Sequence, residues 1–189
     1  MDFLKNRKAA VAIFVAVVVV FSLIGCHISL NRACRGVENA FFDRTQYSGY
    51  DYFTAPGDQL NACVNYANRL LSVINGSDAL AEDYAAVLES SLALSEALER
   101  RDISEIYTAN STLSAAVSAA DEKVRAGAPL RDSSDDYETI VSDFFSAQRV
   151  AAQSPYNDIV DAFISGTANA FPTGILRRLA FVSLPEKFA

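Results

Sequence analysis

The feature that most constrains this chain is an apolar run near its N-terminus. Residues 9–25 read AAVAIFVAVVVVFSLIG, which is 17 residues without a charged side chain, and the run reaches 22 residues if it is extended to Leu30. A helix of about 20 apolar residues crosses the roughly 30 Å of hydrocarbon in a bilayer. We therefore predict a transmembrane helix over residues 9–28, preceded by a short N-terminal segment of residues 1–8.

The sequence Leu-Ile-Gly-Cys at the end of this run leaves a second interpretation open. It is the pattern at which a bacterial lipoprotein signal is cut, after which Cys26 would carry lipid. The apolar region of a cleaved signal usually has about 7 to 15 residues, so the length here favours an uncleaved helix. A buried helix of a soluble domain is the third alternative, although eleven successive apolar residues from Ala9 to Val19 would be hard to bury. The first two interpretations both attach the protein to a membrane.

The charges on either side of the run predict its orientation. Lys5, Arg7 and Lys8 precede it, whereas Arg32 and Arg35 come just after it. Cytoplasmic flanks of membrane helices carry an excess of Lys and Arg. The small bias predicts a single-pass protein of the cell membrane, with a cytoplasmic N-terminus and the remaining residues, 29–189, in an outward-facing domain.

That domain is acidic. Residues 27–189 contain 13 Lys and Arg against 22 Asp and Glu, a net charge of −9. Nucleic-acid binding needs a basic patch, so nucleic acid is not an expected partner. A length of about 150 residues suits one domain that can bury a core.

Beyond the anchor the apolar residues recur at helical spacing, and no stretch alternates as a strand would. We expect the anchor helix to continue toward Arg44 along a stripe of Leu30, Cys34, Val37 and Phe41. Further helices are expected over about 58–74, 79–100 and 102–126, and a long last one from Asp132 should be kinked or divided by Pro155. The predicted fold is all-α, an N-terminal transmembrane helix followed by a four-helix bundle of long antiparallel helices. The positions expected to face inward are Leu60, Val64, Ala67, Leu71 and Ile74, then Leu80, Tyr84, Val87 or Leu88, and Leu98, then Tyr137, Val141, Phe144 and Gln148, and finally Ile159, Val160, Phe163 and Ile164.

The helix after residue 101 has the clearest pattern. Asp102 is placed to cap it, and Glu105 three residues later completes a capping-box sequence. Its apolar seam is predicted to be Ile103, Ile106, Asn110, Leu113, Val117, Ala120 and Val124. Within that seam Asn110 either is buried with a hydrogen-bond partner that fixes register, or lies at the edge in water.

The last forty residues carry a recognisable order of motifs. Tyr156, Asn157, Asp158 and Val160 are followed by Phe171 and Pro172, and then by Pro185 and Phe188. This order resembles the closing segment of the LemA family, in which a Tyr-Asn-Asp-x-Val helix leads to Phe-Pro and a short tail with a late proline and aromatic. The N-terminal half resembles the family in outline only, through its membrane helix and the sequences SLNRACRGVENAF and DQLNACV. The family's Trp, paired arginines and motif proline have no counterpart near Asp58.

The resemblance implies a bacterial, membrane-anchored bundle of long helices without an established enzymatic activity. Tyr156, Asn157 and Asp158 are then interpreted as a helix-packing motif, with a partner-binding role as the alternative. We expect a scaffold or interaction module for another protein of the cell envelope. A ligand-sensing helical module, or a lipoprotein with the same bundle, is the alternative.

Residues for catalysis are scarce in the sequence. The chain has one histidine, His27, at the membrane edge, where it is too isolated for a catalytic triad or a zinc site. Adjacent carboxylates such as Asp121 and Glu122 point in different directions on a helix, which is typical of solvated surface. No glycine-rich phosphate loop is present. We therefore expect no enzyme activity, no metal and no cofactor.

Two cysteines remain beyond Cys26. Cys34 and Cys63 lie on the apolar stripes of successive predicted helices. They would either form a disulfide in an oxidising space or remain two small buried thiols.

Overall fold

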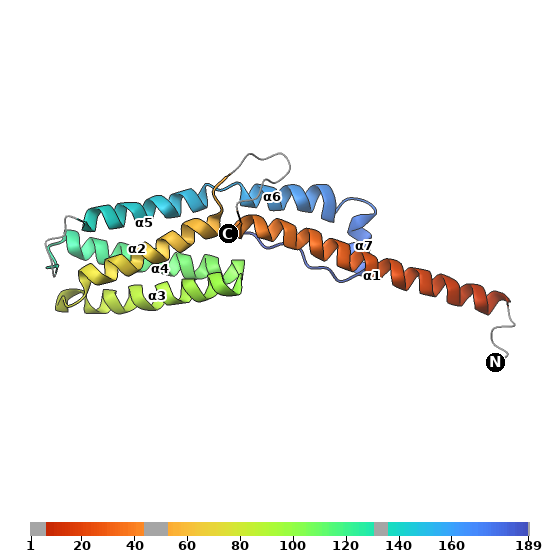
Figure 1. Cartoon of the computed structure of the whole chain (residues 1–189), viewed down its shortest axis with the longest axis horizontal. Helices are drawn as coiled ribbons and strands as arrows, with labels where there is room; N and C mark the ends of the chain where they lie inside the picture. Colours follow the sequence, from red (N-terminus) through yellow and green to blue (C-terminus); the bar gives the residue numbers. More distant parts are fainter. Residues whose placement is uncertain (1–6, 44–52, 131–135, 189) are drawn as a thin grey trace. The chain divides into compact units, whose positions relative to one another are not determined.

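A computed structural model describes residues 7–43, 53–130 and 136–188, and every regular element in these ranges is helical. The longer helices are α1 (Arg7–Phe42), α2 (Pro56–Ile74), α3 (Ala81–Arg100), α4 (Ile103–Arg125), α5 (Tyr137–Ala152), α6 (Tyr156–Phe163) and α7 (Thr173–Leu179) (Figure 1). A 3-10 turn at Asp78–Leu80 precedes α3, and a π-helical turn at Ile164–Ala168 follows α6. The prediction of an all-α protein is confirmed for this part of the chain. The expected turn around Gly49 and the expected helix start at Asp132 lie outside the described residues.

The chain divides into two compact units. The first unit consists of Met1–Glu38 and Asp158–Pro185, and the second of Asn39–Asn157 and Glu186–Ala189. The helices α1 and α6 each contribute residues to both units. The range expected to form one domain, residues 29–189, is thus shared between the two.

Helix α1 changes character along its length. Its most apolar 18-residue window has a mean hydropathy of 2.9 and none of it is buried, so α1 is long and apolar enough to cross a membrane. It is the one such helix in the described ranges, and it lies near the N-terminus as expected. Beyond Ile28, which is exposed, one side of the helix becomes buried at Leu30, Cys34 and Val37. This stripe was predicted from its spacing of four and three residues.

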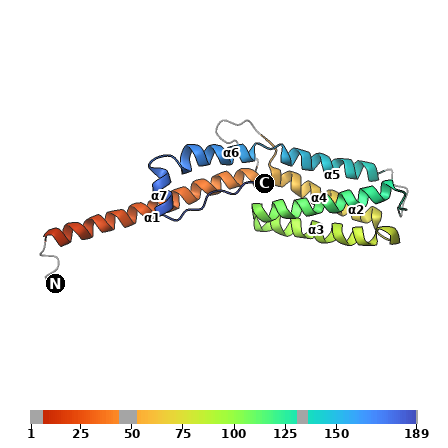
Figure 2. The ribbon, with the colours of Figure 1, turned by 180° about the vertical axis from the view of Figure 1, so that it is seen from behind.

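In the first unit the C-terminal part of the chain lies beside α1 (Figure 2). The Nδ1 atom of His27 is 2.8 Å from the carbonyl oxygen of Ala180, and the Nδ2 group of Asn31 is 3.0 Å from His27 Nε2. If Nδ1 carries the proton, the imidazole donates to Ala180 and accepts from Asn31, which satisfies both ring nitrogens. The Sγ group of Cys34 donates to the carbonyl oxygen of Ser183 at 3.5 Å. These contacts attach residues 180–183 to α1.

In the second unit α2 packs against α3 and α5, and α3 packs against α4. Most members of the expected stripes are buried, but Val64, Tyr84, Gln148 and Ile164 are only half-buried. Two of the differences concern neighbouring positions on one helix. On α2, Val64 is half-buried and its neighbour Cys63 is fully buried instead. On α3, the alternative between Val87 and Leu88 is resolved, since Val87 is buried and Leu88 is exposed. In both cases the inward direction depends on which helices flank the element, and periodicity alone leaves an uncertainty of one position.

The seam of α4 is confirmed except at its polar member and its end. Ile103, Ile106, Leu113, Val117 and Ala120 are buried, and Val124 is half-buried. Asn110 combines features of the two alternatives, because it is half-buried and its Oδ1 accepts a hydrogen bond from Gln148 Nε2 of α5 at 3.0 Å.

The turn between α3 and α4 is fixed by its backbone. Arg101 has a left-handed backbone conformation with φ of 57°. Its N–H donates to the carbonyl oxygen of Leu98, and the N–H of Asp102 donates to the carbonyl oxygen of Ala97. This is a Schellman ending. The Arg101 guanidinium also lies 4.3 Å from the ring centroid of Phe42 and 3.5 Å from a carboxylate oxygen of Asp43. The turn is therefore held to the residues at the end of α1 within the same unit.

Pro155 separates the last long helix into two. At the end of α5 the N–H of Gln153 donates to the carbonyl oxygen of Arg149, and the N–H of Ser154 donates to that of Ala151. The next helix, α6, begins at Tyr156. A proline has no N–H to continue a helix, as the sequence predicted.

All three cysteines are free thiols. Cys34 and Cys63 are buried, and Cys63 Sγ donates to the carbonyl oxygen of Phe144 at 3.7 Å. Burial raises the pKa of the Cys63 thiol from 9.0 to about 12. The structure thus agrees with two buried thiols and contains no disulfide between them.

Candidate functional site

The second unit contains a groove between α3 and α4 with a volume of about 540 Å³. Its walls consist mainly of small side chains, with one ion pair at one end. The lining residues are Ala86, Glu89, Ser90, Ala93, Ala97 and Arg100 from α3, and Ser104, Glu105, Thr108, Ala109, Thr112 and Ala116 from α4. Side chains as short as these leave the helix backbones accessible to a partner that packs against them.

Three of the four hydroxyl groups in the groove, those of Ser90, Thr108 and Thr112, are hydrogen-bonded to their own helices. Ser90 Oγ donates to Ala86 O at 2.6 Å, and Thr108 Oγ1 donates to Ser104 O at 3.1 Å. One turn further on, Thr112 Oγ1 donates to Thr108 O at 3.0 Å. Because these donors are in use, the groove presents mainly methyl groups, and its character is more apolar than its composition indicates.

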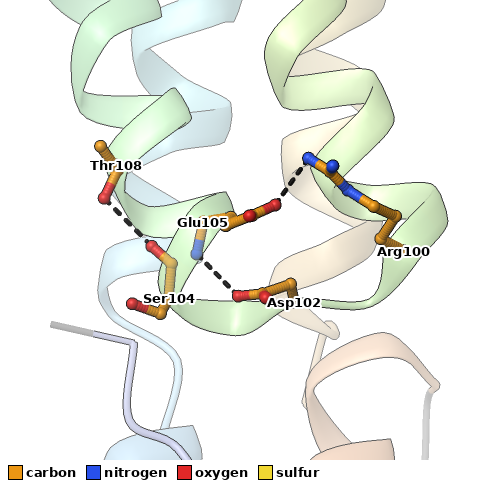
Figure 3. A network of polar contacts seen from close by, with 5 residues as sticks. All are labelled: Arg100, Asp102, Ser104, Glu105 and Thr108. Atoms are coloured by element: carbon orange, nitrogen blue, oxygen red, sulfur yellow. Dashed lines mark hydrogen bonds and ion pairs between the residues drawn. The ribbon is translucent and has the colours of Figure 1, made fainter.

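The charged end of the groove lies at the start of α4 (Figure 3). An Nη2 group of Arg100 is 2.6 Å from Glu105 Oε2 across the turn. Asp102 Oδ1 accepts from the N–H of Glu105 at 2.9 Å, which confirms the predicted cap. The other half of the predicted capping box, a bond from the Asp102 N–H to the Glu105 carboxylate, is wrong. The Asp102 N–H donates to the carbonyl oxygen of Ala97, and the Glu105 carboxylate pairs with Arg100 instead.

A second carboxylate reaches the same helix start from the C-terminal tail of the unit. Glu186 Oε2 accepts from the N–H of Ser104 at 3.2 Å. Carboxylates are favoured at a helix N-terminus because free N–H groups and the helix dipole meet there. The tail is therefore attached beside the charged end of the groove.

Tyr156 and Asn157 hold this tail. The Tyr156 hydroxyl donates to the carbonyl oxygen of Glu186 at 2.6 Å. The Asn157 side-chain amide binds the backbone of Phe188 twice, accepting from its N–H at 2.9 Å and donating to its carbonyl oxygen at 2.8 Å. We call these contacts of Tyr156 and Asn157 with residues 186–188 the tail clamp.

The clamp positions an aromatic cluster. The ring of Phe188 lies 5.2 Å from that of Phe41 and 5.4 Å from that of Tyr107, and the rings of Phe41 and Tyr156 are 5.1 Å apart. Such edge-on and tilted pairs stabilise a fold beyond the area that they bury. The sequence pointed to Tyr156, Asn157 and Phe188, but it gave no indication that they meet.

The other residues singled out in the sequence are distributed differently. Asp158 is exposed and Val160 is buried, both in the part of α6 that belongs to the first unit. Phe171 and Pro172 are exposed in the first unit, joined by a cis peptide bond. Cys26 is half-buried on α1, among the exposed apolar residues.

An ion pair between a buried carboxylate of α3 and an exposed lysine of α4 was not anticipated. Asp83 is buried, and its Oδ2 lies 2.7 Å from Lys123 Nζ. The hydrogen bond to Asp83 raises the pKa of the Lys123 ammonium. Periodicity treats a lone acidic residue as surface, so this pair had no signal in the sequence. Among the described residues no group of three or more His, Cys, Asp or Glu side chains is arranged to hold a metal ion.

Comparison of the chain with family models, curated proteins and solved structures gave no match.

Proposed function

We propose that this protein is a membrane-anchored scaffold, in which α1 fixes a helical domain to the cell membrane and the groove between α3 and α4 receives a helix of another envelope protein. The observation that carries the anchor is the change along α1. Most of its apolar residues from Val11 to Ile28 are exposed, and its stripe from Leu30 onward is buried. Such a run of exposed apolar side chains would be strongly unfavourable in water and is favourable in hydrocarbon.

The charges flanking α1 support an outward-facing domain and a cytoplasmic N-terminus. Arg7 and Lys8 stand at the start of the helix, before the apolar run. The domain that follows is acidic, and acidic residues oppose translocation less than basic ones do. The location proposed is the envelope of a bacterial cell, with one membrane crossing.

The groove supports an apolar helix as its occupant. A helix that carries small or aliphatic residues at i, i+3, i+4 and i+7 would lay that stripe between α3 and α4, against the methyl groups of Ala93, Ala109 and Thr112. Glu89 lines the same groove, and Glu105 is paired with Arg100, so a basic residue flanking the stripe beside Glu89 would be favoured.

The arrangement of the second unit supports a four-helix bundle of α2, α3, α4 and α5. The pairs α2 with α5, α2 with α3 and α3 with α4 are in contact, and Gln148 of α5 bonds Asn110 of α4. The tail clamp supports the LemA-like character of the chain, because Asn157 of the resembling segment bonds Phe188, and Tyr156 and Phe188 both pack against Phe41.

The groove also favours a second candidate, a ligand-sensing module. A volume of about 540 Å³ is within the range of small-molecule sites, which are concave and largely apolar. The scaffold is preferred because three of the groove's four hydroxyl groups are bonded within their own helices, which leaves few groups to orient a small ligand.

The experiment uses matched positions on α3. Ala93 lines the groove, whereas Ala85 is equally an exposed alanine of α3 and lies outside the lining set. A photo-crosslinking amino acid is placed at each position in the full chain, in membranes of producing cells. We expect one discrete protein product from position 93, with little or none from position 85.

A competing substitution makes the test specific. Ala109→Trp fills the groove from α4 and should abolish the product formed at position 93, whereas Ala85→Trp should leave it unchanged. Equal products at positions 93 and 85 would contradict the scaffold. Retention of a small molecule by the purified protein, lost in Ala109→Trp, would favour the sensing module.

A further inference from the structure

Exposed apolar side chains are clustered on and around α7 in the first unit. Phe171 and Phe181 are 86% and 90% exposed, and Ile175 and Leu179 are each 56% exposed. We call these four residues the α7 patch. Exposed apolar clusters mark contacts with a membrane or a partner, because water is a poor solvent for them.

Hydrogen bonds place this patch at a definite level along α1. His27 bonds Ala180, and Cys34 bonds Ser183. Seven helical residues rise about 10 Å, which is the length of about three extended residues, so residues 180–183 run along α1 in the same direction. Since α7 ends at Leu179, directly before Ala180, and Phe181 directly follows Ala180, both of these patch residues lie close to the level of His27. The views in Figures 1 and 2 agree that α7 lies beside α1.

That level is where α1 leaves the bilayer in the proposed topology. The predicted span ends at residue 28, and Ile24 and Ile28 of α1 are themselves exposed. Helices that lie in a membrane interface bury their apolar side about 5–10 Å into the boundary between headgroups and acyl chains. A patch within a few residues of His27 falls in that layer.

The charge of the segment also suits a lipid surface. Residues 162–185 contain no Asp or Glu, and their two charged residues are Arg177 and Arg178, although the chain as a whole has a net charge of −7. Arg177 bonds Val182 O at 3.3 Å and Asn169 Oδ1 at 3.5 Å, whereas the side chain of Arg178 is exposed. An exposed arginine beside apolar residues can reach the phosphates while the apolar groups insert.

We propose that the α7 patch is a second membrane contact, in which Phe171, Ile175, Leu179 and Phe181 insert into the outer-leaflet interface beside α1 and Arg178 binds lipid phosphates. This inference rests on the proposed anchor. A single helix leaves a protein free to tilt and rotate about the membrane normal. A second contact in the same unit restricts both motions of that unit.

The chain contains no tryptophan, so one introduced indole reports on one position. The full chain carrying Phe181→Trp is reconstituted into vesicles of phosphatidylcholine and phosphatidylglycerol, in which one lipid carries bromine on its acyl chains. Phe14→Trp in the apolar run of α1 serves as the reference for the anchor. Tyr107→Trp, at a half-exposed position of the second unit, serves as the control outside the patch.

We expect Phe14→Trp and Phe181→Trp to lose emission to brominated lipid, and Tyr107→Trp to lose none. For Phe181→Trp, bromines near the headgroup should quench more than bromines near the chain end. Phe171→Trp repeats the measurement at an independent, equally exposed site. Adding Arg178→Glu to either patch variant should reduce the quenching, most strongly in vesicles rich in phosphatidylglycerol.

The remaining outcomes separate the two proposals. Quenching of Phe14→Trp alone would overturn the second contact and leave the anchor intact. A blue-shifted but unquenched signal from both Phe171→Trp and Phe181→Trp would mean that protein covers the patch, which also overturns the proposal. Absence of quenching at all positions would refute the anchor itself.

Discussion

Replacing Asn157 by alanine tests whether the tail clamp holds the aromatic cluster together. The substitution removes two hydrogen bonds to the Phe188 backbone, of 2.8 and 2.9 Å. A hydrogen bond contributes about 1 kcal/mol net, and a polar group left unpaired in a partly buried site costs about 1–3 kcal/mol. Because Asn157 is half-buried, water can reach part of the site, and we expect a loss of about 2 kcal/mol in the free energy of unfolding.

A double-mutant cycle distinguishes positioning from simple bonding. Phe188→Ala removes a half-buried ring from Phe41 and Tyr107, and should cost about 2 kcal/mol, below the range for a fully buried Phe. Asn157 binds only the backbone of Phe188, which that substitution leaves in place. If the clamp acts by holding the ring, the double variant should be about 1 kcal/mol more stable than the sum of the single losses predicts.

The assay is urea unfolding of the full chain in mild detergent, followed by helical circular dichroism. Asn65→Ala, at an exposed position of α2, is the matched control and should change stability by less than about 0.5 kcal/mol. Strictly additive losses would refute the positioning role of Asn157. A loss no greater than that of the control would refute the clamp.

Four further predictions address the ion pair, the buried Cys63 thiol, the anchor and its orientation. Lys123→Met should lower the urea midpoint, because it leaves the buried Asp83 unpaired. In the native chain the contribution of this ion pair to the free energy of unfolding should be complete below pH 10.5 and lost as pH rises through the raised pKa of Lys123. The raised pKa of Cys63 should make it unreactive toward iodoacetamide in the folded chain at pH 9, and rapid labelling would contradict its burial. The free energy of unfolding should fall between pH 9 and 12, because in this range the thiol ionises in the unfolded chain but not in the folded one. Cys26→Ala, or a blocker of lipoprotein signal cleavage, should alter neither mass nor membrane retention, whereas a shift in mass with loss of retention would favour the lipidated form. Protease added to intact spheroplasts should digest the chain beyond Leu30, and complete protection would reverse the proposed orientation.

The parts of the fold that the sequence predicts are those governed by one helix at a time. The stripe of Leu30, Cys34 and Val37 and the seam from Ile103 to Ala120 follow from spacing alone, because each helix needs one buried side. The break at Pro155 and the cap at Asp102 are equally local. These features depend on residues within about one turn of each other.

The candidate sites depend on contacts between distant segments, which spacing does not encode. Glu105 pairs with Arg100 because the Schellman turn brings the two together and occupies the N–H that a capping box needs. The groove consists mainly of alanines, serines and threonines, residues that carry no distinctive pattern in a helix. The tail clamp joins Asn157 to Phe188 across 31 positions. Aromatic and amide residues near the end of the chain were the only signal, and they did not identify their partners.

The membrane contact and the groove use opposite chemistry, and this makes them separately testable. The segment from residue 162 to residue 185 is free of acidic residues and exposes large apolar side chains, whereas the groove is formed by small side chains and includes Glu89 and Glu105. The α7 patch belongs to the first unit and the groove to the second. A substitution such as Ala109→Trp should therefore abolish partner capture without changing the quenching of an indole at position 181. A change in both measurements would mean that the two units are energetically coupled, and the carriers of that coupling would be α1 and α6, the two helices that contribute to both units.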